Sequence, residues 1–185
     1  MEEKMLKKMK KFIFIIPLMF AVYLSSCVGV QQSETGLPNI VIELSPDKFT
    51  QFLKDRFPIE KDVKIGKLVL KNPNVLKIDK NNKLELGTDV VFDSLIDVDG
   101  RVDIAGNIYF DRDKKAFYLQ NPEIKKLKFF NQDFTPPPIV DTALNSLINM
   151  FFKQTPIYQF DKIYQKYLVK DVKVEDGKIK VILGF

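Results

Sequence analysis

Apolar and polar residues alternate over a long central part of the chain. From residue 83 to residue 98 the even positions are mostly apolar, whereas the odd positions carry most of the charged side chains. A period of two over this length predicts a long antiparallel strand with one buried face. Asp99-Gly100 then predicts a hairpin turn, after which the alternation resumes through Phe110. Further strands are expected on both sides, so this part of the chain predicts an antiparallel meander.

The period changes from 2 to 3.6 after the three prolines at 136–138. Val140, Leu144, Leu147 and Phe151 share one face of a predicted helix, and the apolar residues beside them widen that face. Such a wide apolar surface requires a partner that covers most of the helix. We therefore expect the sheet to wrap around this helix.

Shorter elements complete the expected fold. Ser45-Pro46-Asp47 predicts the start of a short helix that ends at Phe57-Pro58, because serine caps helices and proline suits the first helical position. Residues 158–168 are expected to form another short helix, followed by a hairpin around Glu175-Asp176-Gly177. The predicted class is α+β: a long curved antiparallel sheet wrapped around the long helix of the C-terminal half, plus a short N-terminal helix.

The N-terminal residues have the pattern of a bacterial export signal. Five lysines within residues 1–11 precede an apolar stretch at 12–24. This stretch is shorter than the roughly 20 residues that span a bilayer as a helix. Leu24-Ser25-Ser26-Cys27 follows and resembles the bacterial lipobox, in which the cysteine sulfur receives diacylglycerol before cleavage. Cys27 is the only cysteine in the chain, so it cannot form an intramolecular disulfide.

Two alternatives to lipidation remain open at this point. Cys27 can be an incidental thiol behind an ordinary secretory signal, or the apolar stretch can be an uncleaved anchor. We expect a cleaved lipoprotein signal peptide at 1–26, a lipidated Cys27 with a flexible tether at 27–38, and a single domain at 39–185. The expected location is the cell envelope, and in an organism with two membranes the outer one, facing the periplasm. Val28 indicates this, because it replaces the aspartate that typically retains lipoproteins at the inner membrane.

The sequence offers little for catalysis. It contains no histidine, which excludes Ser-His-Asp and Cys-His arrangements, and it contains no glycine-rich phosphate-binding motif. The formal charge of +5 comes largely from lysines of the signal segment, so it favours neither nucleic acid nor an acidic substrate. The central carboxylates fall mainly on the outward face of the predicted strands, where a solvated surface is expected. We expect no enzyme, cofactor or metal site. These carboxylates are Asp89, Asp93, Asp97, Asp99 and Asp103.

The chain is rich in phenylalanine and tyrosine and contains no tryptophan. These rings either fill a core, or they line a tunnel or groove that the strands and the long helix leave open for an acyl chain. The sequence alone leaves both readings open.

Two C-terminal segments carry a family resemblance. The run LNSLINMFFKQTPIY at 144–158, followed by VKVEDGKIKVIL at 172–183, resembles the YceB-like bacterial lipoproteins. That family is of uncertain function, and its fold is similar to a half-unit of the tubular lipid-binding (BPI-like) superfamily. The resemblance implies one wall of a ligand space from the helix and an opposing wall from the sheet. The helix residues are Val140, Leu144, Leu147 and Phe151, and the sheet residues are Leu86, Val90, Phe92, Ile104 and Ile108.

The leading expectation is a membrane-anchored envelope lipoprotein that binds or shuttles a hydrophobic ligand, such as a lipid acyl chain, without catalysis. Its partners would be a membrane, through the lipid on Cys27, and this ligand, with no nucleic acid. The alternative is a structural or assembly lipoprotein with a filled core that binds another envelope protein through a sheet edge or an exposed patch.

Overall fold

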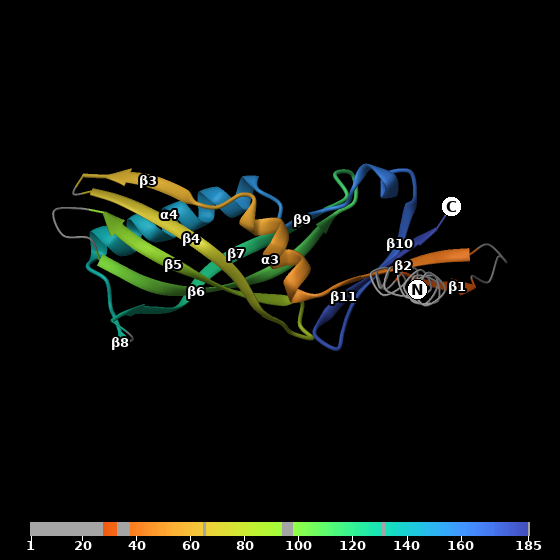
Figure 1. The fold of residues 1–185 in the computed structure, drawn as a ribbon, viewed down its shortest axis with the longest axis horizontal. Helices are drawn as coiled ribbons and strands as arrows, with labels where there is room; N and C mark the ends of the chain where they lie inside the picture. Colours follow the sequence, from red (N-terminus) through yellow and green to blue (C-terminus); the bar gives the residue numbers. More distant parts are fainter. Residues whose placement is uncertain (1–27, 33–37, 65, 94–97, 131, 185) are drawn as a thin grey trace, which may run out of the picture.

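The computed structural model describes residues 28–32, 38–64, 66–93, 98–130 and 132–184. Cys27, Asp97 and the predicted signal peptide lie outside these residues. The described part contains eleven strands, two α-helices and one short 3₁₀ helix. The strands form two antiparallel sheets, which occupy opposite ends of an elongated molecule (Figure 1). None of the helices in the described part has the length and apolar character needed to cross a bilayer.

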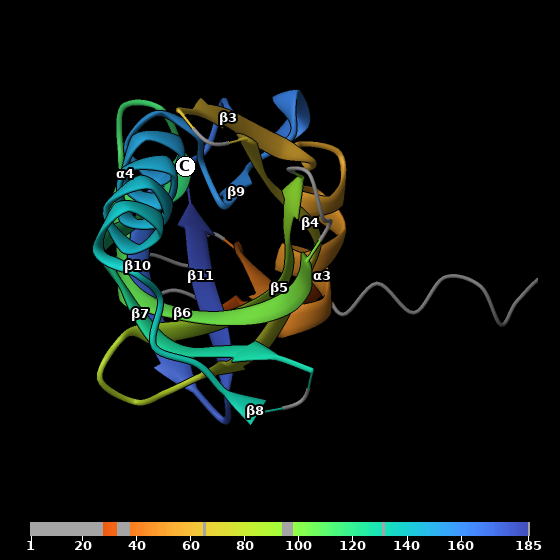
Figure 2. The same cartoon turned by 90° about the vertical axis from the view of Figure 1, so that its left-hand side faces the viewer.

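The larger sheet is the predicted meander. Its strands follow one another in chain order, and the short strand β9 adds to β7. Seen along the molecule, the sheet curls so that its first strand comes back toward β7 (Figure 2). Its strands are β3 (Ile59–Val63), β4 (Gly66–Ile78), β5 (Lys83–Asp93), β6 (Val98–Asp111), β7 (Ala116–Phe129), β8 (Gln132–Asp133) and β9 (Tyr158–Gln159).

The predicted hairpin turn at Asp99-Gly100 is wrong. Both residues lie within β6, where they pair with Val91 and Val90 of β5. Gly100 serves close packing in place of a turn, because a Cβ atom there would lie 2.5 Å from the ring of Phe129. Gly100 therefore lies where the ring of Phe129 packs closely against β6, and not in a turn.

The smaller sheet joins the two ends of the described chain. Its strand order is β1-β2-β11-β10, so the pairing of β2 with β11 connects residues that are far apart in sequence. The predicted hairpin at residues 175–177 is confirmed as the β10–β11 turn. The first residues of the predicted tether form β1. The bounds are β1 (Val28–Gln32), β2 (Pro38–Leu44), β10 (Leu168–Glu175) and β11 (Lys178–Gly184).

The two α-helices cover different parts of the larger sheet. The predicted short helix is α3 (Pro46–Lys54), which packs on β4 and ends before Phe57. The predicted long helix is α4 (Pro138–Gln154), which packs against β7 and β3. The further helix expected at 158–168 is wrong, because that segment holds β9 and only the 3₁₀ turn Lys162–Tyr164.

The predicted α+β class, with a sheet wrapped around a long helix, is also wrong. The described chain is mostly β, and α4 lies between two margins of the curled sheet, where it closes the gap (Figure 2). The expectation failed because only one stripe of α4 is buried. Ile139 and Met150 on its other sides remain 47% and 49% exposed. An apolar side chain on a helix surface does not require a covering partner.

Candidate functional site

The nine residues expected to line a ligand space belong mostly to the interior. Leu86, Val90, Ile104, Leu144 and Leu147 are fully buried in one continuous hydrophobic core. Phe92, Ile108 and Phe151 are partly buried and pack against this core, whereas Val140 is half-buried at the start of α4. The structure therefore brings the chosen faces of sheet and helix into a shared interior. None of the nine lines any of four hollows found on the surface of the described part of the chain.

The largest of these hollows runs along α4 on its solvent side. This α4 groove has a volume of about 940 Å³. One wall is α4 and the other is formed by β6, β7 and the turn between them. Its most informative lining residues are Tyr109, Lys114, Tyr118, Asn149, Met150 and Lys153.

The helix wall follows from residue spacing. Ser146, Asn149, Met150 and Lys153 are three or four residues apart, so they share one side of α4. This side adjoins the buried stripe that contains Leu147. Met150 supplies a flexible and polarisable apolar side chain among polar neighbours. The helix wall is therefore amphipathic.

The sheet wall is built from paired strands and one irregularity. Tyr109 of β6 lies directly opposite Tyr118 of β7, so the two phenol rings are cross-strand neighbours. Further along, the β6–β7 register shifts, and Asn121 adopts a φ of 49° before Pro122. Both residues line the groove. A bulge of this kind bends a strand locally, as often occurs beside binding sites.

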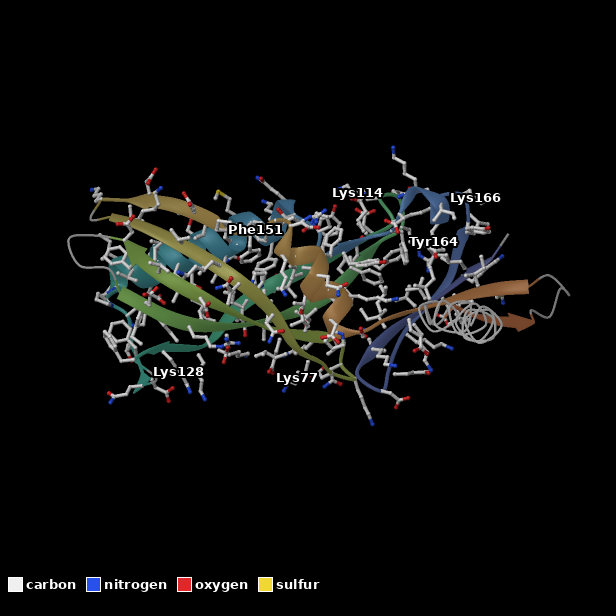
Figure 3. The ribbon with its side chains drawn as sticks, in the orientation of Figure 1. Lys77, Lys114, Lys128, Phe151, Tyr164 and Lys166 are labelled. Atoms are coloured by element: carbon white, nitrogen blue, oxygen red, sulfur yellow. The ribbon has the colours of Figure 1, made fainter. Side chains whose placement is uncertain are left out.

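Positive charge gathers in the α4 groove. Lys114 Nζ lies 3.7 Å from Asp111 Oδ2 and 5.3 Å from the centre of the Tyr118 ring. Figure 3 shows Lys114 at the hairpin end of the groove. Lys153 lies on the helix wall, and it forms no ion pair within the described residues. The groove thus combines two ammonium groups and the carboxylate of Asp111 with tyrosine rings and a thioether, so its lining carries a net positive charge, which suits an amphipathic anion.

Three of the carboxylates predicted on the outer strand face, Asp89, Asp99 and Asp103, form ion pairs there, whereas Asp97 lies outside the described residues. Arg101 of β6 lies 4.0 Å from Asp89 and 3.4 Å from Asp103, and Asp99 lies 3.7 Å from Lys71. Most of these residues line a second hollow of about 650 Å³ on the outside of the sheet. Their arrangement is a ladder of paired charges, with each of these three carboxylates facing a cation.

The groove residues escaped sequence reasoning for a physical reason. That reasoning followed the apolar positions, which point inward, whereas Tyr109 and Tyr118 stand on the opposite face of their strands from buried Ile104 and Phe117. One sequence signal could have identified the groove: Tyr109 and Tyr118 stand at outward strand positions, where polar residues are expected. Met150 carried a similar signal, because it lies outside the buried stripe of α4.

Comparisons with known proteins identify a family for most of the chain. Residues 44–178 match the model of a family described as "Protein of unknown function (DUF1439)". The match runs from the end of β2 to the start of β11 and so covers the whole larger sheet and both helices. A search of curated proteins finds no match.

Proposed function

Because the chain belongs to the DUF1439 family of proteins of unknown function, we propose a function from its geometry. We propose a lipid-anchored envelope protein that binds an amphipathic anion, such as a fatty acid or a lipid with an acidic head group, in the α4 groove. It does so without catalysis. Ligand exchange with the surroundings is possible because the groove lies at the surface.

The observation that carries this proposal is that one groove brings two lysines together with the rings of Tyr109 and Tyr118 and the thioether of Met150. A volume of about 940 Å³ is at the upper end of the range of small-molecule sites, roughly 300 to 1,000 Å³. An acyl chain lying against Tyr109, Tyr118 and Met150 gains roughly 0.8 kcal/mol for each CH₂ removed from water. Lys114 and Lys153 complement an acidic head group.

The interior supports the groove, not a tunnel, as the place for the ligand. The residues expected to line a tunnel are packed into the core. The same observation favours the second candidate, a structural or assembly lipoprotein with a filled core that binds another envelope protein. The two candidates differ in whether the α4 groove has affinity for acyl chains.

The anchor and the finer family assignment are also part of the proposal. The lipobox-like sequence supports lipidation of Cys27, and the segments at 144–158 and 172–183 support a YceB-like lipoprotein. The apolar concave face of the curled sheet supports a relation to tubular lipid-binding proteins. For an organism with two membranes we propose the outer membrane, facing the periplasm. Metabolic labelling with a fatty acid tests the anchor: label on wild type and none on Cys27→Ser supports it, and equal label contradicts it.

The groove is tested by binding of a fluorescent fatty acid to purified protein. Met150→Asp replaces the apolar side chain of the helix wall with a carboxylate, and we expect about tenfold weaker binding, equivalent to about 1.4 kcal/mol. The matched control is Ile163→Asp, which replaces an exposed apolar residue on the 3₁₀ turn outside the groove. Native mass spectrometry of wild type checks for lipid that purifies with the protein. Equal binding by both variants and wild type, or no binding at all, would favour the assembly role.

A further inference from the structure

Two phenylalanines beside the short strand β8 are left in solvent by the fold: Phe130 in the turn that precedes β8, and Phe134 directly after it. Phe130 is 83% exposed and Phe134 is 42% exposed. We refer to these two residues as the aromatic tip. The tip lies at the far end of the larger sheet, whereas β1 lies at the opposite end of the molecule (Figure 1).

The backbone at Phe130 is unusual for its residue type. Phe129 pairs with Gln132, so Phe130 is the first residue of a two-residue turn, and its φ is 51°. Turns of this geometry favour glycine, asparagine or aspartate, because bulky residues are disfavoured in the left-handed region. The β10–β11 turn follows this rule with Asp176 and Gly177. Phe130 therefore occupies a position where the fold itself prefers another residue.

Phe134 is held in place although its ring is exposed. Its ring lies edge-on to that of Phe129, with ring centres 4.8 Å apart, and its backbone N–H donates to the Leu127 carbonyl at 2.9 Å. Strand alternation places Phe134 on the same side as buried Leu127. Phe130, in contrast, lines the outer hollow beside Lys128. The two rings thus flank the end of the hairpin on both sides.

One lysine, Lys128, lies beside the tip, as expected for contact with anionic lipid. Lys128 shares the outer hollow with Phe130 and projects near this end (Figure 3). Lys64 is exposed in the turn between β3 and β4, which lies at the same end of the molecule but on the opposite edge from β8 (Figure 2). Lysine stems reach phosphates while aromatic rings enter the layer beneath. Asp133 stands opposite Lys128 in the register, so the rings provide most of the effect and charge adds to it.

The exposed area distinguishes a bilayer from a protein partner. Two rings exposed to this extent offer on the order of 250 Å², well below the roughly 800 Å² that each partner buries in a stable protein complex. Insertion into a bilayer needs no complementary surface, and a protruding turn suits it. We propose that the aromatic tip inserts into the interfacial layer of a bilayer that contains anionic lipid.

The position of the tip also specifies which bilayer it contacts. Cys27 directly precedes β1, which lies at the other end of the molecule. A protein anchored through Cys27 therefore presents the tip to a second, apposed bilayer. This orientation rests on the proposed anchor, whereas insertion of the rings does not.

The first experiment uses the absence of tryptophan from the chain. Phe130→Trp introduces a single fluorescent reporter. The protein is purified after removal of its predicted signal peptide and reconstituted into vesicles. Phosphatidylglycerol and phosphatidylethanolamine vesicles with brominated acyl chains are then added. We expect a blue shift and quenching of the tryptophan emission. Leu168→Trp, at a 61% exposed position in β10, is the control and should not change.

The second experiment separates function from folding. Phe130→Asn suits the left-handed turn, so we expect the thermal midpoint to remain equal or rise. Vesicle association, measured by light scattering, should weaken at least tenfold. Leu168→Asn, which also removes an exposed apolar side chain, should associate like wild type.

Each result decides the proposal. Unchanged emission of Phe130→Trp with brominated vesicles, or wild-type association of Phe130→Asn, overturns it. Capture of a protein by a photocrosslinker at position 130, without quenching by lipid, overturns the bilayer assignment in favour of a protein contact. If mass spectrometry shows no lipid on Cys27, the same vesicles are added to the free protein. In that case the proposed lipidation of Cys27 is contradicted, whereas insertion of the aromatic tip is still tested.

Discussion

The inner and outer faces of the larger sheet are built by different rules. On the inner face, Leu84, Leu86 and Ile104 are fully buried in one continuous core with side chains of α4. On the outer face, Asp89, Arg101 and Asp103 form half-exposed ion pairs. Burial of apolar area stabilises far more than exposed ion pairs, which typically contribute less than about 1 kcal/mol. The comparison teaches that one face determines stability and the other is free to vary or to bind.

The largest loss of stability is expected when a buried side chain of the inner face is truncated. Ile104→Ala removes a fully buried side chain, and we expect a loss of about 2 to 5 kcal/mol in the free energy of unfolding. Asn107→Ala, an exposed position on the same strand, is the control and should change stability by less than about 0.5 kcal/mol. Urea denaturation of both variants measures the difference. Similar small losses in both would show that the interior is not packed as described.

Overfilling the inner face sharpens the distinction between core and groove. Leu147→Trp adds volume at a fully buried position of α4, and we expect it to cost about 1 to 3 kcal/mol. Binding of a fluorescent fatty acid should persist, because the α4 groove lies outside the core. A variant that remains stable but loses fatty-acid binding would place the ligand in the interior instead.

The outer face responds to change at a glycine. Arg101 lies across Gly87, so a Cβ atom there would meet its guanidinium group. Gly87→Ala should displace Arg101 from Asp103 and cost about 0.5 to 1 kcal/mol, a loss that high salt reduces. The inner-face loss in Ile104→Ala should not depend on salt. Denaturation at low and high sodium chloride separates the two.

A pH-dependent effect is expected from a ring that packs between α3 and the sheet. Burial raises the pKa of Tyr158 to about 12 from 10.0, with Asp161 adding to the shift. A raised pKa in the folded state means that the stability contributed by Tyr158 is present below pH 10 and is lost as the pH rises toward 12. We expect Tyr158→Phe to lose less stability than wild type between pH 10 and 12. Parallel thermal midpoints for both proteins across this interval would contradict the assignment.

The sequence predicted those parts of the fold that depend on local periodicity. Alternation placed Leu86 and Ile104 inside and Asp89 and Asp103 outside, because side chains in a strand point to opposite faces. The short helix α3 was predicted from its N-terminal proline, and Ser45 occupies the N-cap position although its side chain makes no capping hydrogen bond. These features depend only on residues close together in the chain.

The remaining features depend on contacts between distant segments. Gly100 was read as a turn because the ring of Phe129 that covers it is not visible in local sequence. The pairing of β2 with β11 has no local pattern, so the smaller sheet was not predicted. The α4 groove requires a helix and a hairpin to come together. Met150 and Tyr118 gave no indication by themselves that they share one surface.

The pairing of β2 with β11 has a consequence for the order of folding. β11 follows every strand of the larger sheet in the chain, so β2 lacks this partner while the meander forms from neighbouring segments. Pairings between distant segments form slowly, because the entropy cost of closing the intervening loop comes before the stabilising contacts are made. The smaller sheet therefore completes the structure last. Until then the edge of β2 that will pair with β11 is open. The incompletely folded chain can therefore associate with other chains through this edge.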